Sequence, residues 1–151
     1  MITEKISPHF TLDMLTRSES AKRKGIPNTP GPIELERLRA LSETILEPLY
    51  RRYGSKVVVT SAYRSKALND AIGGSKTSQH MKGEAADLIV AGVSNLEVAK
   101  WLSRNVKYGQ VIHEFGEWVH VSLPYPKGPQ LLTCYRKGGK VVYESGLKEI
   151  P

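Results

Sequence analysis

Residues 78–90 read Ser-Gln-His-Met-Lys-Gly-Glu-Ala-Ala-Asp-Leu-Ile-Val, a polar loop that turns into an apolar run. The run over 85–90 predicts a buried strand. Asp87 interrupts this strand, and burying a carboxylate without a partner costs free energy. A strand that begins near Glu84 would let the strand aspartate converge with His80, which stands in the preceding loop.

A second polar residue, His120, interrupts an apolar run in the middle of residues 118–122, Trp-Val-His-Val-Ser. Two imidazoles and one carboxylate make a three-ligand set that leaves a fourth position open, which is the pattern of a catalytic zinc site. The residues alone also allow two simpler roles. A histidine in a strand is often a hydrogen-bonded core residue or a surface residue, and Asp87 could accept hydrogen bonds from backbone amides.

The rest of the chain mixes helices and strands without the regular alternation of a parallel α/β fold. Pro32 suits a first helical position, and the apolar spacing after it predicts a helix up to Gly54, with a kink or restart at Pro48. Further helices are predicted after a cap at Thr11 or Asp13, over 65–72 and over 94–106, and strands over 57–60, 85–90, 111–115, 118–123, 130–135 and 140–143. We expect a single α+β domain over residues 1–151, with a mainly antiparallel sheet flanked by helices.

The chain has 151 residues and one cysteine, Cys134, which excludes an internal disulfide and a cysteine-rich zinc site. No apolar run approaches the ~18 residues of a membrane span, and the start MITEKISPHF shows no signal-peptide pattern, so we expect neither membrane insertion nor a signal peptide. The formal net charge of +7 indicates attraction to a polyanion such as nucleic acid, an anionic membrane surface or a cell wall, although a solvated basic face explains it equally well. No nucleic-acid-binding motif accompanies the charge, so we expect no specific nucleic-acid partner.

Three ordered segments carry a resemblance to a known family. Residues 78–87 fit S-x-H-x-x-G-x-A-x-D at every fixed position, residues 60–65 (Thr-Ser-Ala-Tyr-Arg-Ser) resemble S-G/A-Y-R-S, and residues 118–122 resemble W-V-H-V-S. Together they resemble the M15 family of zinc peptidases, the D-Ala-D-Ala carboxypeptidase and dipeptidase group that shares its fold with hedgehog signalling domains. The resemblance runs from about His9 to Ser122, and its opening is similar to small M15-type proteins encoded by bacteriophages.

The resemblance implies that His80, Asp87 and His120 bind Zn²⁺. It also implies that Arg64 faces the substrate carbonyl or carboxylate, although a structural ion pair is the alternative role for this arginine. The implied activity is a peptidoglycan peptidase that cleaves wall peptides through a metal-activated water, here a phage endolysin-type endopeptidase. A D-Ala-D-Ala carboxypeptidase or dipeptidase, and a zinc-containing module that binds without catalysis, are the alternatives.

The resemblance further implies the partner and the place of action. The partner is the peptide part of bacterial peptidoglycan, and the basic charge suits an anionic wall. We expect a monomer that is made in the host cytoplasm and then released to the cell wall, or that is carried on the virion.

Two glutamates compete for the role of general base. Glu117 stands three residues before His120, as in the dipeptidase branch of the family, and Glu114 stands six before it, as in the hedgehog-like branch. A strand running straight through 117–120 would put Glu117 and His120 on opposite faces. We therefore favour Glu114 and keep Glu117 as the alternative.

The loop of the predicted hairpin decides which residue faces His120. A three-residue loop over 116–118 would pair Glu114 across from His120. A two-residue turn that begins at Gly116 would bring His113 opposite His120 instead. His113 is therefore a further candidate for a polar group beside the site.

Overall fold

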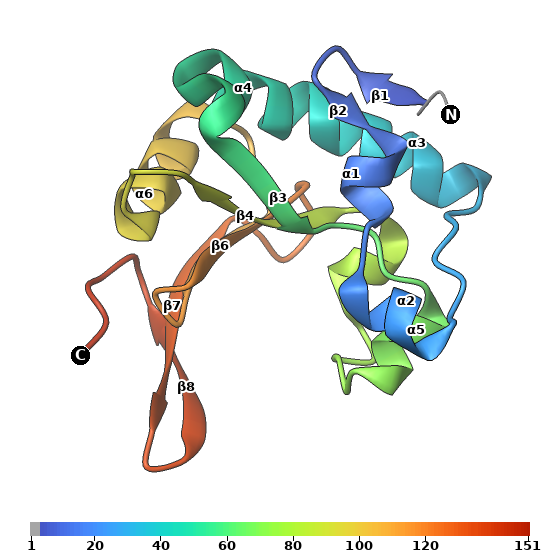
Figure 1. Cartoon of the computed structure of the whole chain (residues 1–151). Helices are drawn as coiled ribbons and strands as arrows, with labels where there is room; N and C mark the ends of the chain where they lie inside the picture. The colour runs from blue at the N-terminus through green and yellow to red at the C-terminus, as the bar shows by residue number, and fades with distance from the viewer. Residues whose placement is uncertain (1–3) are drawn as a thin grey trace.

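A six-stranded sheet in the order β3-β4-β6-β5-β7-β8 forms the centre of the computed structural model, which describes residues 4–151 (Figure 1). Its strands are β3 (Val57–Ser61), β4 (Ala85–Val90), β5 (Gln110–Glu114), β6 (Trp118–Ser122), β7 (Gln130–Lys137) and β8 (Lys140–Ser145). All neighbouring strands are antiparallel except β5 and β7, which are parallel. The expectation of an α+β fold with a mainly antiparallel sheet is confirmed.

The remaining elements precede the sheet or connect its strands. They are β1 (Lys5–Ser7), β2 (Phe10–Thr11), α1 (Leu12–Thr16), α2 (Glu19–Lys24), α3 (Pro32–Leu41), the π-helical turn η1 (Ser42–Leu46), α4 (Glu47–Tyr53), the 3₁₀ turn η2 (Gly54–Lys56), α5 (Lys66–Ala71), the 3₁₀ turn η3 (Gln79–Lys82) and α6 (Asn95–Asn105). The predicted cap at Thr11 accepts a hydrogen bond from the Met14 N–H at the start of α1. The short elements β1, β2 and α2 are not predicted, because segments this short carry too little periodicity.

Within the described part of the chain, no helix is long and apolar enough to cross a membrane. The expectation that the chain starts without a signal peptide concerns its first residues, and of these 1–3 lie outside the described residues.

The main sheet divides its side chains between two faces. Leu88 of β4 and Val119 and Val121 of β6 are fully buried in the core that also contains the apolar residues of α3, α4 and α6. Asp87 and His120 alternate with these residues along the same strands, so they project from the opposite face. One face therefore packs the core, and the other carries the polar residues that the sequence analysis singles out.

The predicted kink at Pro48 takes the form of a π-helical turn. Instead of restarting, the helix runs on from α3 through η1 into α4, and the Glu47 N–H donates to the Ser42 carbonyl five residues back. A proline lacks the N–H of a regular helix, and its ring would clash with the carbonyl four residues before it. The wider turn just ahead of Pro48 accommodates the ring without breaking the helix.

Glu47 fastens the β1–β2 hairpin to this helix. Its buried carboxylate accepts hydrogen bonds from the Ser7 hydroxyl (2.6 Å), the His9 backbone N–H (2.8 Å) and His9 Nδ1 (2.7 Å). The His9 ring also stacks on Tyr50 with centroids 3.8 Å apart. Burial alone would raise the pKa of Glu47, but the hydrogen bonds from Ser7 and His9 outweigh it and hold the pKa below its ordinary value.

We expect Glu47→Gln to lower the free energy of unfolding by about 1.5–3 kcal/mol, because it weakens hydrogen bonds to a buried charged acceptor. Urea unfolding at neutral pH measures this loss. Glu43→Gln, at an exposed position of η1, is the matched control and should change stability by less than about 0.5 kcal/mol.

The difference in unfolding free energy between the wild type and Glu47→Gln should depend on pH in one direction. Because folding lowers the pKa of Glu47, its contribution is complete above the ordinary value of 4.5 and fades as the pH falls through the lower folded value. An advantage of the wild type that grows in acid would contradict this assignment.

Candidate metal centre

The pairing of β4 with β6 places Asp87 directly opposite His120 near the middle of the main sheet. Asp87 Oδ1 lies 3.0 Å from His120 Nδ1, and Asp87 Oδ2 lies 3.3 Å from His80 Nε2. One possible ligand atom from each of the three residues lies within 4.8 Å of the other two. The fold thus brings together the three residues that the sequence patterns predict as ligands.

His80 reaches this cluster from turn η3, which comes just before β4. The Ser78 hydroxyl accepts a hydrogen bond from the His80 backbone N–H (3.2 Å) at the start of the turn. The His80 ring is buried, and its Nδ1 donates to the Ala62 carbonyl oxygen over 2.7 Å. This hydrogen bond sets the tautomer and orientation of the ring, and Nε2 is left facing Asp87.

The two histidines offset the cost of burying Asp87. Burial alone would raise the pKa of this carboxyl. The electrostatic attraction of His80 and the hydrogen bonds from His120 and His80 outweigh burial and hold the pKa well below its ordinary value of 3.8. Asp87 is therefore an anion at neutral pH, the form in which a carboxylate binds a metal.

The donor set fits a zinc ion. Two atoms bonded to zinc at about 2.0–2.1 Å, with a tetrahedral angle between them, lie roughly 3.3 Å apart. Each histidine lies at about this spacing from one oxygen of Asp87, His120 from Oδ1 (3.0 Å) and His80 from Oδ2 (3.3 Å). Imidazole nitrogens and a carboxylate oxygen are ligands that zinc accepts, and three of them leave one position open. The three ligand atoms, which lie within 4.8 Å of one another, could approach a single ion.

The β5–β6 hairpin has a register that neither predicted loop describes. Glu114 pairs with Trp118 and Ile112 pairs with His120, so the three loop residues are 115–117. Phe115 and Gly116 both have positive φ, 56° and 69°, and this lets the chain reverse one position earlier than expected. Both expected pairings with His120 are therefore wrong.

Glu114 nevertheless faces the cluster. It stands two residues from Ile112, the partner of His120, so its side chain projects from the same face of the sheet. Glu114 Oε1 lies 3.9 Å from His120 Nδ1. Burial and the nearby Asp87 charge raise the pKa of Glu114, although His120, Trp118 and Arg64 oppose part of this rise. The Trp118 indole N–H is buried and forms no regular hydrogen bond among the described residues. It nevertheless lies close enough to Glu114 to favour the charged form of that carboxylate.

Glu117 and His113 lie away from the cluster. Glu117 is exposed in the hairpin loop, where its N–H donates to the Glu114 carbonyl over 3.0 Å. His113 pairs with Val119, on the core face of the sheet, and its Nδ1 donates to the Lys148 carbonyl oxygen at 3.0 Å. The expectation that His113 lies beside the site is wrong, because the observed register turns its ring to the other face.

A cavity of about 1040 Å³ contains the cluster and Glu114, and Arg64 also lines it. The Arg64 backbone N–H donates to the His80 carbonyl (3.1 Å), which ties this residue to the loop that carries His80. Burial lowers the pKa of Arg64, whereas Asp87 and Glu114 favour its charged form, and a guanidinium stays protonated at neutral pH. Its buried Nε has no hydrogen-bond partner among residues 4–151, so the group retains donor capacity.

Four aromatic residues line this cavity, and the sequence patterns assign a role in the site to none of them: Phe115, Trp118, Tyr125 and Tyr143. Trp118 belongs to a recognised segment, but only the hairpin register shows that it pairs with Glu114. Tyr125 lies in the β6–β7 loop, and Tyr143 comes from β8, which the chain order places far from the cluster. The pairing of β5 with β7 and of β7 with β8 places Tyr143 there, and no local sequence pattern indicates it.

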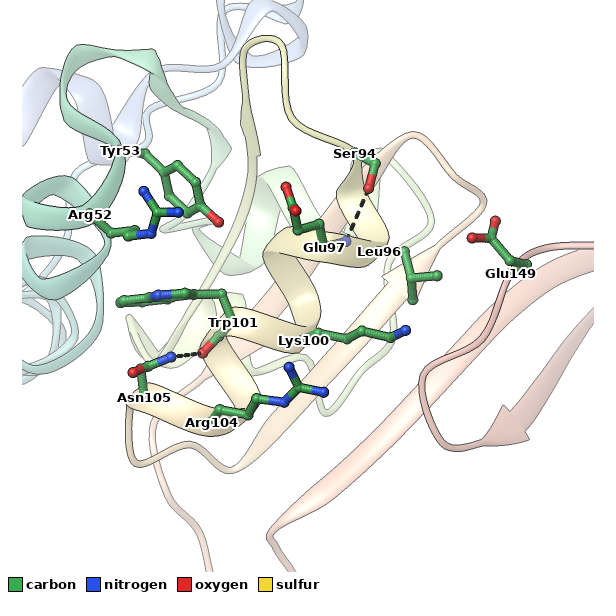
Figure 2. A pocket seen from close by; sticks show the side chains of 10 residues that line it. All are labelled: Arg52, Tyr53, Ser94, Leu96, Glu97, Lys100, Trp101, Arg104, Asn105 and Glu149. Atoms are coloured by element: carbon green, nitrogen blue, oxygen red, sulfur yellow. Dashed lines mark hydrogen bonds between the residues drawn. The ribbon is translucent and has the colours of Figure 1, made fainter.

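A second cavity, of about 550 Å³, lies against α6 and carries none of these groups (Figure 2). The rings of Tyr53 from α4 and Trp101 from α6 pack there with centroids 6.1 Å apart. Lys100 and Arg104 of α6 also line this cavity. Its lining also includes Glu97, so charges of both signs are mixed. The group of His80, Asp87 and His120 lines the larger cavity and not this one.

The comparison with protein families agrees with the geometry. A family model described as Peptidase M15 matches residues 8–122, which include every residue of the cluster, Arg64 and both glutamates. The chain therefore belongs to the Peptidase M15 family. This membership implies a metallopeptidase that acts on a peptide substrate. No curated protein matches the chain closely.

Gly83 closes the turn that carries His80. We expect Gly83→Ala to lower the free energy of unfolding by more than the cost of placing an alanine at positive φ. Its φ is +75°, and a Cβ there would lie 2.5 Å from the Glu34 carbonyl oxygen of α3. Gly92→Ala is the matched control, because its φ is +78° with no atom within 4 Å of the added carbon. The control should lose about 1–2 kcal/mol in urea unfolding, and Gly83→Ala clearly more. Equal losses would contradict the close approach of α3 to the turn.

Proposed function

We propose that the protein is a zinc-dependent peptidoglycan peptidase, an endopeptidase of the phage endolysin type that cleaves the peptide part of the bacterial wall. One observation carries the proposal: the three candidate ligands His80, Asp87 and His120 converge in a cavity that also holds Glu114. Family membership supports peptidase chemistry, and the donor set supports zinc.

In this proposal each residue has a separate task. Zinc, when bound, supplies a Lewis acid that polarises the substrate carbonyl and makes water a stronger nucleophile. Glu114, whose Oε1 lies 3.9 Å from His120 Nδ1, takes a proton from the attacking water and delivers it to the leaving amine. Arg64 donates hydrogen bonds to the carbonyl oxygen as negative charge develops on it. Glu117, exposed in the hairpin loop, is the less favoured base.

The shape and charge of the molecule support a polymeric, anionic substrate. The cavity extends from the 73–79 loop across the sheet to Tyr143 on β8, which leaves room for chain on both sides of a cleaved bond. This extent favours an endopeptidase over a carboxypeptidase or dipeptidase. A net charge of +7 favours association with an anionic wall, to which the protein would be released from the host cytoplasm or carried on a virion.

Mass spectrometry of fragments released from purified peptidoglycan tests the proposal, with a chelator-treated sample as control. Chelator-sensitive fragments with new internal peptide termini would support a metal-dependent endopeptidase. Loss of only terminal residues would support the carboxypeptidase alternative. If the zinc-loaded protein released no fragment from several wall types, the proposal would fail in favour of a binding module.

We expect His120→Ala to lose stoichiometric zinc and activity together, because two remaining ligands hold the ion poorly. Elemental analysis after dialysis measures the zinc content. His113→Asn is the matched control, since this histidine lies on the core face of the sheet and asparagine can still donate toward the Lys148 carbonyl. Full zinc occupancy in His120→Ala would remove this residue from the ligand set.

We expect Glu114→Gln to keep its zinc and to lose about 10²–10⁴-fold in kcat, which is the usual contribution of a general base. The same substitution at Glu117 should leave kcat within about twofold. Steady-state cleavage of a soluble wall fragment, measured beside zinc content, checks both variants. A large loss in Glu117→Gln with a normal Glu114→Gln would exchange the two roles.

A further inference from the structure

The C-terminal hairpin continues the face of the sheet that carries the candidate metal centre. Glu114 of β5 pairs with Cys134 of β7, and Cys134 pairs with Tyr143 of β8. Residues paired across a sheet project to the same side. Glu114, Cys134 and Tyr143 therefore form one row, and Tyr143 lines the same cavity as the cluster. This hairpin, which extends away from the body in Figure 1, lies beyond the residues that match the family.

The middle of this row is neutral. Cys134 is fully buried, and burial together with the Glu114 charge raises its pKa to about 11. Its thiol therefore stays protonated and acts as an apolar spacer between the glutamate and the tyrosine.

The outer end of the row is an exposed apolar surface. Tyr143 is 57% exposed, and Val141, two residues along β8 on the same side, is 44% exposed. Arg136 pairs with Val141, and its guanidinium lies over the Phe115 ring, 4.9 Å from the centroid. Phe115 itself lines the cavity. The Arg136 guanidinium thus lies between Phe115, which lines the cavity, and the exposed side chains of Val141 and Tyr143.

We propose that this surface of β7–β8, formed by Tyr143, Val141 and Arg136, binds the part of an acidic peptide that continues beyond the cleaved bond. Aliphatic groups of that peptide pack on Tyr143 and Val141, and a carboxylate pairs with Arg136. The inference rests on the proposed function, since it assigns a substrate segment to the same cleft.

The position of Glu114 selects which segment lies there. The base returns its proton to the leaving amine, so the leaving side of the bond points toward Glu114. On the side of Glu114 that lies away from the cluster on β4 and β6, the sheet continues through β7 and β8 to its edge. A peptide that extends beyond the leaving amine on this side therefore runs along the cavity toward Tyr143. A substrate that ends at the leaving residue does not reach this surface.

Two synthetic peptides test the proposal, both spanning the bond that mass spectrometry identifies. One has a single residue after the bond, and the other has three, including an acidic one. In the wild type the longer peptide has the lower KM. Tyr143→Ala lowers the ratio of the KM of the shorter peptide to that of the longer one about tenfold, and it changes the ratio of their kcat values little. Tyr143→Phe, which keeps the ring, restores most of the advantage. Val142→Ala, on the opposite face of β8, is the matched control.

Arg136 is tested with the longer peptide after its acidic side chain has been converted to an amide. The wild type discriminates against the amide, and Arg136→Gln cancels that discrimination. An unchanged KM advantage in Tyr143→Ala would overturn the proposal while leaving the peptidase intact.

Retention on insoluble peptidoglycan in the presence of a chelator separates binding from chemistry. If the wild type cleaves no wall substrate, the proposed function fails, and this measurement still tests the surface. Tyr143→Ala should then elute earlier than the wild type and Val142→Ala. Equal retention of all three proteins would overturn the proposal.

Discussion

The pairing of Asp87 with His120 across β4 and β6 is the constraint on which the rest of the structure depends. A carboxylate on a central strand is stable only with partners, and this register supplies one imidazole directly while the turn before β4 supplies another. A shift by one residue would send Asp87 into the apolar core and turn Leu88 outward. The same register therefore secures the core packing on one face and the donor cluster on the other.

The supporting elements converge on the loop that carries His80. Gly83 allows α3 to approach within contact of this loop, and the Ala62 carbonyl holds the imidazole ring from the end of β3. His80 thus comes from a turn that α3 and Ala62 support, whereas Asp87 and His120 come from two strands that pair with each other. Such bracing lets a cluster assembled from distant segments keep its geometry before any ligand binds.

Local patterns predict most of the fold and single out the three residues that the fold brings together, because β4, β6 and the turn around His80 have distinctive sequences. Long-range pairing is where prediction fails. The β5–β6 loop begins at Phe115, a non-glycine residue with positive φ, and residue preferences do not indicate that choice. The same limit hides Tyr143, whose place in one row with Glu114 and Cys134 follows from the pairing of β5 with β7 and of β7 with β8. The π-helical turn before Pro48 is likewise a response to packing that no periodicity reveals.

The sheet ends at β8, and a free strand edge can add a strand from another molecule, the first step toward aggregation. Here the edge strand carries the charged residues Lys140 and Glu144, and Lys137 lies at the end of the neighbouring β7. Gly138 and Gly139, both with positive φ, form the turn between the two strands. Charges at these positions resist strand addition because each new pair would bury or juxtapose them. The chain can thus expose Val141 and Tyr143 on the face of the hairpin and remain protected against fibre growth at its edge.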